Sequence, residues 1–195
     1  MKNARIKKMT TIAILMALVV VMQFISGIIP PIGGFSLSLV LIPIVLGAAM
    51  FGPFTGALLG GVFGAVVFIN CITGADVGGA MVFQASPILC FLVVMGKGIL
   101  AGFASGCVYK LFKSKNKNTY TAMLLAAIVC PIVNTGVFIT CMLSLFIDVL
   151  NAWANGAGIV GYILTGLVLA NFVPELIINI LFSPASARIV NIKER

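Results

Sequence analysis

The chain has 195 residues, of which 62% are hydrophobic and only 8% are charged, and its formal net charge is +8. A soluble domain carries about 25% charged residues, so this composition leaves too little polar surface to face water and predicts a membrane protein. Histidine is absent, which argues against metalloproteases, haem proteins with histidine ligands and serine–histidine hydrolases.

Six apolar stretches are candidates for membrane-spanning helices, which need about 20 apolar residues to cross the hydrocarbon core. They are residues 9–29, 36–51, 54–69, 87–111, 120–147 and 158–182. The basic "MKNARIKK" and apolar "TIAILMALVVVM" resemble a signal peptide, but no A-x-A site follows, so a first helix is favoured. We predict an all-α membrane protein whose single domain, residues 1–195, contains six transmembrane helices.

Basic residues gather in three clusters at or beyond the ends of these stretches. They are Lys2, Arg5, Lys7 and Lys8, then Lys110, Lys113, Lys115 and Lys117, and finally Arg188, Lys193 and Arg195. With six spans all three clusters fall on one side of the membrane, which the positive-inside rule identifies as the cytoplasm. The sequence therefore predicts that the N- and C-termini are both cytoplasmic.

The three connections on the opposite side, near 30–35, 70–86 and 148–157, contain no lysine or arginine. The first two are rich in glycine, and the first also contains consecutive prolines, a composition that fits both movable lids and ordinary surface turns. Trp153 lies in the third connection, where we interpret it as an interfacial anchor, with stacking on a ligand as the alternative.

Small residues recur every four positions in three of the predicted helices, and residues four apart share one helix face. They are Gly52, Gly56, Gly60 and Gly64, then Gly98, Gly102 and Gly106, and finally the pair Ala13 and Ala17. Such faces let neighbouring helices approach closely. For the two glycine series we predict tight packing within this protein.

Lys97 is the one basic residue deep inside a predicted span, and no other charge lies within twelve positions of it. A lysine at the centre of a membrane helix costs about 2.5–3.5 kcal/mol on insertion scales, so something must compensate. An anionic ligand bound in a pocket is one candidate partner. An ion pair with Glu175 is the other, unless Glu175 reaches the inner interface by itself.

Further polar residues accompany Lys97 in or beside the predicted spans. The candidate substrate-binding residues are Lys97, Asn134, Gln84, Asn70, Asn171 and Asp76. Amides both donate and accept hydrogen bonds, which suits a polar, vitamin-like molecule. Hydrogen bonds between helices are the alternative role for each amide.

Catalytic and ATP-binding motifs are lacking. The five cysteines form no CxxC pair, so we interpret them as buried and reduced, and we expect no metal or other cofactor. Gly96 and Lys97 are followed by Gly98, which breaks the Walker pattern, so ATP-driven transport would need another subunit. We expect that the chain is not an enzyme.

Three segments resemble the substrate-binding S components of energy-coupling factor (ECF) transporters, in the branch with riboflavin, folate and pantothenate carriers. They are "SLSLVLIPIVLGAAMFGPFTGALLGGVFG", "KGILAGFASGCVYKLF" and "NFVPELIINILFSPASARIV". The resemblance implies high-affinity capture of a vitamin outside the bacterial plasma membrane. It also implies docking, through an AxxxA motif at Ala13 and Ala17, on a transmembrane coupling subunit that carries two ATPase subunits. We do not expect the chain to bind nucleic acid.

Lys97 is a single cation deep in the membrane, with no arginine beside it, which suits a small anionic ligand. Pantothenate is therefore the favoured vitamin. Riboflavin would need more aromatic side chains to stack on than the outer half of the protein offers. It remains an alternative, together with folate and other vitamins or precursors. A facilitator or channel that works without partners is the alternative class. A membrane enzyme or a structural protein is less compatible with these residues.

Overall fold

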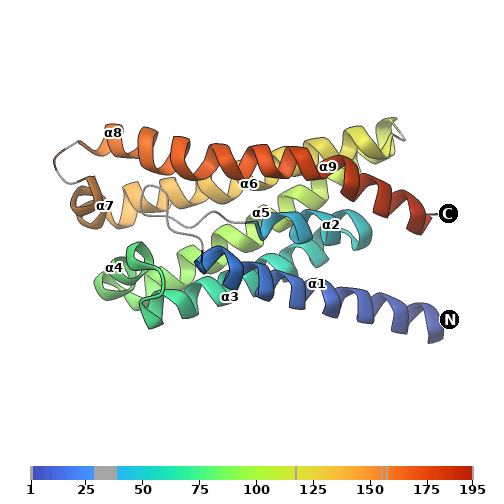
Figure 1. The fold of residues 1–195 in the computed structure, drawn as a ribbon, viewed down its shortest axis with the longest axis horizontal. Coiled ribbons are helices and arrows are strands. Elements are labelled where there is room, and N and C mark those ends of the chain that lie inside the picture. Colours follow the sequence, from blue (N-terminus) through green and yellow to red (C-terminus); the bar gives the residue numbers. More distant parts are fainter. Residues whose placement is uncertain (1, 29–38, 117, 155, 157, 195) are drawn as a thin grey trace.

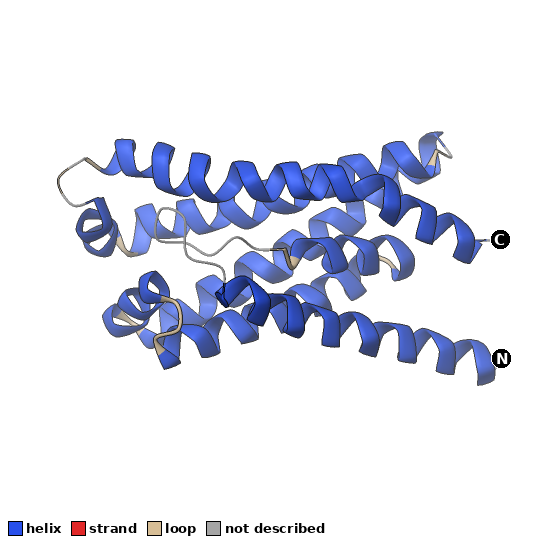
Figure 2. Ribbon diagram, viewed as in Figure 1, coloured by secondary structure: helices blue, strands red, loops and turns tan. Residues whose placement is uncertain are grey.

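The computed structural model describes residues 2–28, 39–116, 118–154, 156 and 158–194. Across these ranges the chain folds into helices and contains no β-strand (Figure 2). The first connection predicted above, near 30–35, and the beginning of the predicted second span lie outside the described residues. The all-helical fold class is thus confirmed for the rest of the chain.

The long helices lie side by side as an elongated bundle (Figure 1). In chain order the elements are α1 (Lys2–Ile28), α2 (Leu41–Phe51), α3 (Pro53–Thr73), α4 (Val77–Ala85), α5 (Pro87–Asn116), α6 (Thr119–Leu145), α7 (Ile147–Ala154), α8 (Ile159–Tyr162), the π-helical η1 (Ile163–Phe172) and α9 (Val173–Glu194). Both termini lie at one end of the bundle, while the short helices α4 and α7 lie at the other end (Figure 1). The number of membrane crossings itself stays a prediction.

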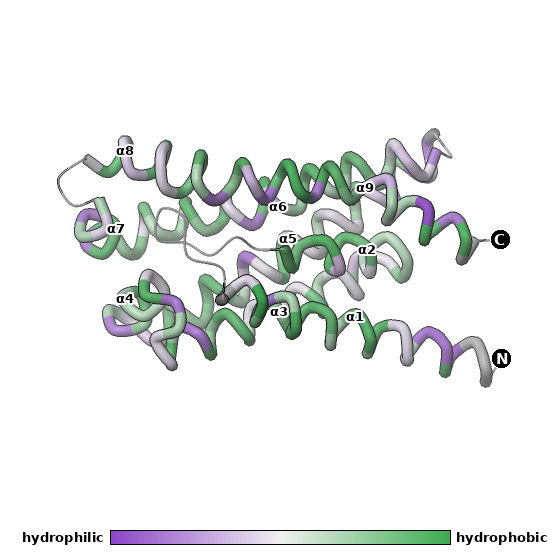
Figure 3. The backbone as a smooth tube through the Cα atoms, viewed as in Figure 1, coloured by the Kyte–Doolittle hydropathy of each residue, from purple (hydrophilic) through white to green (hydrophobic). Residues whose placement is uncertain are grey.

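The surface of the bundle is suited to lipid rather than to water. Among the described residues, five helical stretches are long and apolar enough to cross a membrane. Large apolar side chains point outward along them, including Phe54 and Ile88, which are 84% and 75% exposed. Hydrophobic residues dominate the middle of the bundle in Figure 3, and hydrophilic residues gather near both termini. The protein is therefore a multi-pass membrane protein.

The second predicted span differs most from the structure. We expected a helix over 36–51, whereas α2 covers Leu41–Phe51 and has only 11 residues. At about 1.5 Å per residue this helix is about 16 Å long, roughly half of the hydrocarbon thickness. Gly52 ends it with a positive φ of 98°, and α3 begins with a proline at the next residue. Because α2 is too short to cross the membrane, the topology of six full spans stays a prediction.

Two of the connections that we expected to be loops contain helices instead. The segment 70–86 includes α4, because the Asp76 side chain caps the helix and accepts a hydrogen bond from the Gly79 backbone N–H at 3.1 Å. The segment 148–157 includes most of α7, which carries Asp148 in its first turn. A negative charge there stabilises the helix, because the N-terminal end of the helix dipole is positive. Both predicted connections therefore contain short helices among their described residues, and a role as movable lids stays a prediction.

The glycine series on α3 and α5 confirm the predicted close packing. A Cβ atom added at Gly60 would lie 2.0 Å from the Gly98 carbonyl oxygen, and one at Gly56 would lie 2.2 Å from the Gly102 carbonyl oxygen. The two helices thus meet backbone against backbone, with no room for a methyl group. This contact holds Lys97, the neighbour of Gly98, at a defined position beside α3.

Candidate substrate-binding site

A cavity opens between α3, α4, α5, α6 and η1, in the half of the bundle that is distant from the termini. It contains about 530 Å³ of empty space, part of which is open to solvent. Apolar side chains such as Val67, Val93 and Val94 form part of its wall. The polar and charged residues of the wall are Asp76, Lys97, Asn134, Thr135 and Asn171. A mostly apolar cleft with a few convergent polar groups is the usual form of a small-molecule site.

Lys97 contributes the positive charge of the cavity. Its Nζ atom lies 4.6 Å from the centroid of the Phe138 ring on α6 and 5.8 Å from the centroid of the Phe63 ring on α3. The faces of aromatic rings attract a cation and stabilise it where water is scarce. They offer no lone pairs to the ammonium group, so its three N–H groups keep their capacity to bind a carboxylate.

Glu175, the alternative partner of Lys97, is buried on α9. Only 2% of its surface is exposed, and it is not among the residues that line the cavity. The Asn179 side-chain amide donates a hydrogen bond to the backbone carbonyl of Glu175 at 2.9 Å. Glu175 also interacts electrostatically with Cys130 on α6. The alternative in which Glu175 reaches the interface by itself disagrees with this burial.

Two polar groups on α6 face the cavity without hydrogen bonds from the described residues. Asn134 is 4% exposed and Thr135 is 5% exposed, and neither Asn134 Oδ1 nor Thr135 Oγ1 has a hydrogen-bond partner there. An unsatisfied buried polar group costs about 1–3 kcal/mol. The cost is understandable if these atoms receive hydrogen bonds from a molecule that enters the cavity. α6 presents both atoms just after Pro131, which lacks the N–H of a regular helical residue.

The other predicted site residues are divided between the cavity and its surroundings. Asp76 lines the cavity but also caps α4, and Asn171 lines it from the half-buried η1. Asn70 and Gln84 are not part of the described lining. The Asn70 carbonyl oxygen accepts a hydrogen bond from the Asp76 N–H at 3.3 Å, so Asn70 shapes the turn before α4. Gln84 is exposed.

The structure also adds lining residues that the sequence analysis did not select. Thr135 follows Asn134 directly, and Phe138 lies one helical turn further along the same face, so helical spacing from Asn134 could have identified Phe138. Cys71 and Cys90 line the cavity as well. No local signal connects these two positions, which only the fold brings together. We had interpreted all five cysteines as buried and reduced, which was wrong for the exposed Cys107.

An aromatic cluster extends from the cavity toward α7 and α8. The Phe138 and Trp153 rings are stacked with centroids 6.5 Å apart, and the Tyr162 ring lies 6.3 Å from that of Trp153. The Trp153 indole N–H donates to the sulfur of Met81 on α4 at 3.3 Å. Trp153 therefore joins the two short helices at this end of the bundle and contacts a residue of the cavity wall.

The described residues thus form a helical membrane protein whose mostly apolar cavity carries a few polar groups, and these features are typical of membrane-embedded proteins that bind small molecules. The chain matches the family described as the substrate-specific component of ECF transporters over residues 7–186, and it belongs to this family. A comparison with curated proteins finds no match. Members of the family are the substrate-binding subunits of membrane transporters rather than enzymes, and they associate with the ECF module.

Proposed function

We propose that this chain captures a water-soluble vitamin from outside a bacterial cell, with pantothenate as the favoured substrate. The observation that carries the proposal is the convergence of the Lys97 ammonium group with Asn134 Oδ1 and Thr135 Oγ1 on one cavity. Pantothenate has a carboxylate that would pair with Lys97. Its amide and hydroxyl groups would donate hydrogen bonds to the two buried oxygens.

The mixture of polar and apolar groups in the cavity wall supports a ligand of this kind. The wall combines apolar side chains with a few polar and charged groups, as the walls of small-molecule sites usually do. A carboxylate is attracted most strongly to Lys97 where little water screens the charges. Riboflavin, folate or another vitamin remains the alternative, because the Phe138 ring in the wall would also contact a flat heterocycle.

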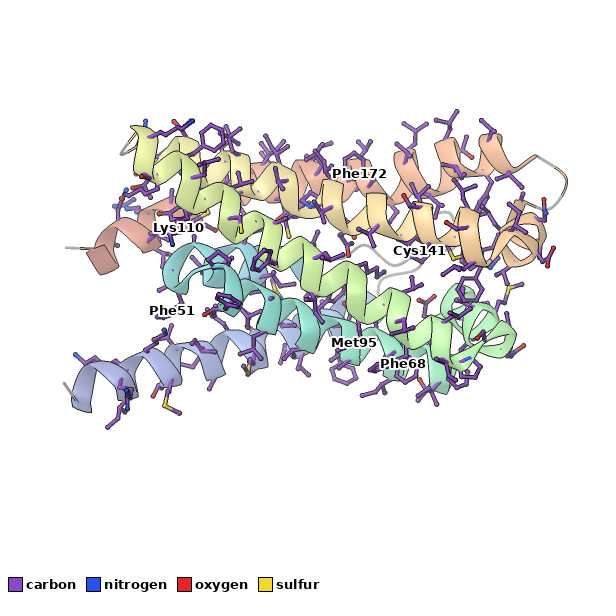
Figure 4. All side chains as sticks on the ribbon, turned by 180° about the vertical axis from the view of Figure 1, so that it is seen from behind. Phe51, Phe68, Met95, Lys110, Cys141 and Phe172 are labelled. Carbon is purple, nitrogen blue, oxygen red and sulfur yellow. The ribbon has the colours of Figure 1, made fainter. Side chains whose placement is uncertain are left out.

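The same proposal includes the orientation of the chain and its partners. Six spans with cytoplasmic termini would make the cavity open to the outside and leave the basic ends inside. Arg5, Lys110 and Arg188 are exposed, and Figure 4 shows Lys110 toward the end of the bundle that carries the termini. Ala13 and Ala17 are exposed on α1, as a docking face for the coupling subunit requires. That subunit would carry the two ATPase subunits that drive uptake.

The first test is to identify the bound molecule. The protein is extracted in mild detergent from cells grown in rich medium, and the ligand released by heat is analysed by mass spectrometry. We expect pantothenate, together with saturable binding of added pantothenate by calorimetry. Recovery of another vitamin would correct the substrate, whereas a protein that retains and binds no small molecule would refute the proposal.

The alternative of a partner-independent facilitator needs a separate measurement. The purified chain alone is reconstituted into liposomes, and uptake of labelled pantothenate is followed with and without the ATPase-containing ECF module. We expect uptake only with the module and ATP. Uptake by the chain alone would favour the facilitator.

A further inference from the structure

Two cysteines lie in contact within the wall of the cavity, away from the three other cysteines of the chain. Cys71 belongs to the last turn of α3 and Cys90 to the first turn of α5, and both are almost completely buried at 2% and 0% exposure. Their thiols lie within hydrogen-bonding distance of each other, and both are free. Both also line the cavity with Lys97. A small oxidant that enters the cavity would therefore meet a dithiol.

The surroundings of this dithiol differ from those of an inert buried cysteine. Lys97 and Asp76 line the same cavity, so the two thiols lie in a wall that also carries charged groups. Cys130, in contrast, is buried on α6 outside the cavity lining.

The segment between the two cysteines contains α4, which forms one side of the cavity. Asp76, Gly79 and Val82 contribute to the cavity wall from the cap and body of α4. A Cβ atom at Gly79 would lie 2.4 Å from Cys71 Sγ, so α4 packs directly on this thiol. A covalent bond between Cys71 and Cys90 would join the ends of α3 and α5 on either side of α4 and would restrict its movement.

We propose that Cys71 and Cys90 are an oxidisable pair whose disulfide locks α4 over the cavity and slows exchange of the ligand. The oxidant is hydrogen peroxide. One thiolate attacks a peroxide oxygen and becomes a sulfenic acid, and the hydroxide that leaves takes up the thiol proton as water. The second thiol displaces the sulfenic hydroxyl group as a second water, so the two thiols are oxidised by two electrons and the peroxide is reduced. The effect on the ligand rests on the proposed function, whereas the bond itself does not.

Peptide mapping tests whether the bond forms. The full-length protein in detergent is treated with one equivalent of hydrogen peroxide, unfolded in the presence of iodoacetamide and analysed by mass spectrometry. We expect a peptide pair joined through Cys71 and Cys90, with Cys107, Cys130 and Cys141 alkylated. Dithiothreitol should reverse the bond, and the Cys90→Ser variant should not form it. Full alkylation of Cys71 and Cys90 in the oxidised, folded wild type would overturn the proposal.

Hydrogen–deuterium exchange tests the lock independently of the ligand. We expect severalfold slower exchange in residues 77–85 after oxidation of the wild type, and no change after the same treatment of Cys90→Ser. Unchanged exchange in the cross-linked protein would contradict the lock. Dissociation of labelled pantothenate, measured in parallel, should slow severalfold on oxidation and recover with dithiothreitol. A protein that forms the bond but never binds pantothenate would refute the substrate assignment alone.

Discussion

Replacing Lys97 with methionine separates a role in ligand binding from a role in folding. The variant keeps a long apolar side chain beside Phe138 and Phe63 but removes the charge that lines the cavity. Removing one partner of a buried, hydrogen-bonded charge pair costs about 2–5 kcal/mol, because the carboxylate of the ligand is left unpaired. At about 1.4 kcal/mol per tenfold, pantothenate binding should weaken by about 30-fold to several thousand-fold.

The ligand-free protein should respond in the opposite direction. A lysine at the centre of a membrane helix costs about 2.5–3.5 kcal/mol on insertion scales, so its removal should leave the melting temperature equal or higher. Binding is measured by calorimetry in detergent, and thermal unfolding by the loss of the monodisperse chromatographic peak. Lys110→Met, an exposed position on the same helix, is the matched control and should change neither property. Unchanged affinity in a folded Lys97→Met protein would refute the reasoning, and a large fall in melting temperature would instead indicate a structural charge partner.

Three other predictions concern packing, docking and the polar wall. Gly60→Ala should lower thermal stability by about 1–3 kcal/mol or more, because the added methyl group meets a backbone carbonyl at 2.0 Å. Gly61→Ala, where the nearest atom is 3.6 Å away, should be tolerated. Changing Ala13 and Ala17 to tryptophan should preserve vitamin binding in detergent but abolish ATP-dependent uptake with the ECF module. Asn134→Leu should weaken pantothenate binding by about 1–3 kcal/mol yet raise the melting temperature of the ligand-free protein, because it removes an unsatisfied buried carbonyl.

Each of these predictions has an opposing outcome. Equal melting temperatures for the Gly60 and Gly61 variants would argue against backbone contact between α3 and α5. Normal uptake by the tryptophan variants would exclude the exposed face of α1 as the docking surface. A lower melting temperature for Asn134→Leu in the absence of ligand would mean that Asn134 stabilises the fold through a partner within the protein.

The site residues show which parts of the cavity wall could be predicted from local sequence patterns. The isolation of Lys97 along the chain was sufficient to select it, and Asn134 followed from its place in an apolar helix. Asn70 and Gln84 were selected by the same reasoning but lie outside the described cavity lining. A polar residue near the end of a helix contacts a cavity only if the helix is rotated toward it, and the rotation of a helix depends on its neighbours.

The sequence by itself determined the membrane environment, the helical fold class, the family and the close packing of α3 on α5. These properties follow from local rules, because lipid forces every backbone group to be satisfied within a helix and glycines four apart form one smooth face. Only the tertiary structure decided that Cys71 meets Cys90, that α4 closes one side of the cavity, and that Thr135 and Phe138 join Lys97. Such contacts join residues that are distant along the chain, and they depend on how helices cross and rotate, which hydropathy and spacing do not encode.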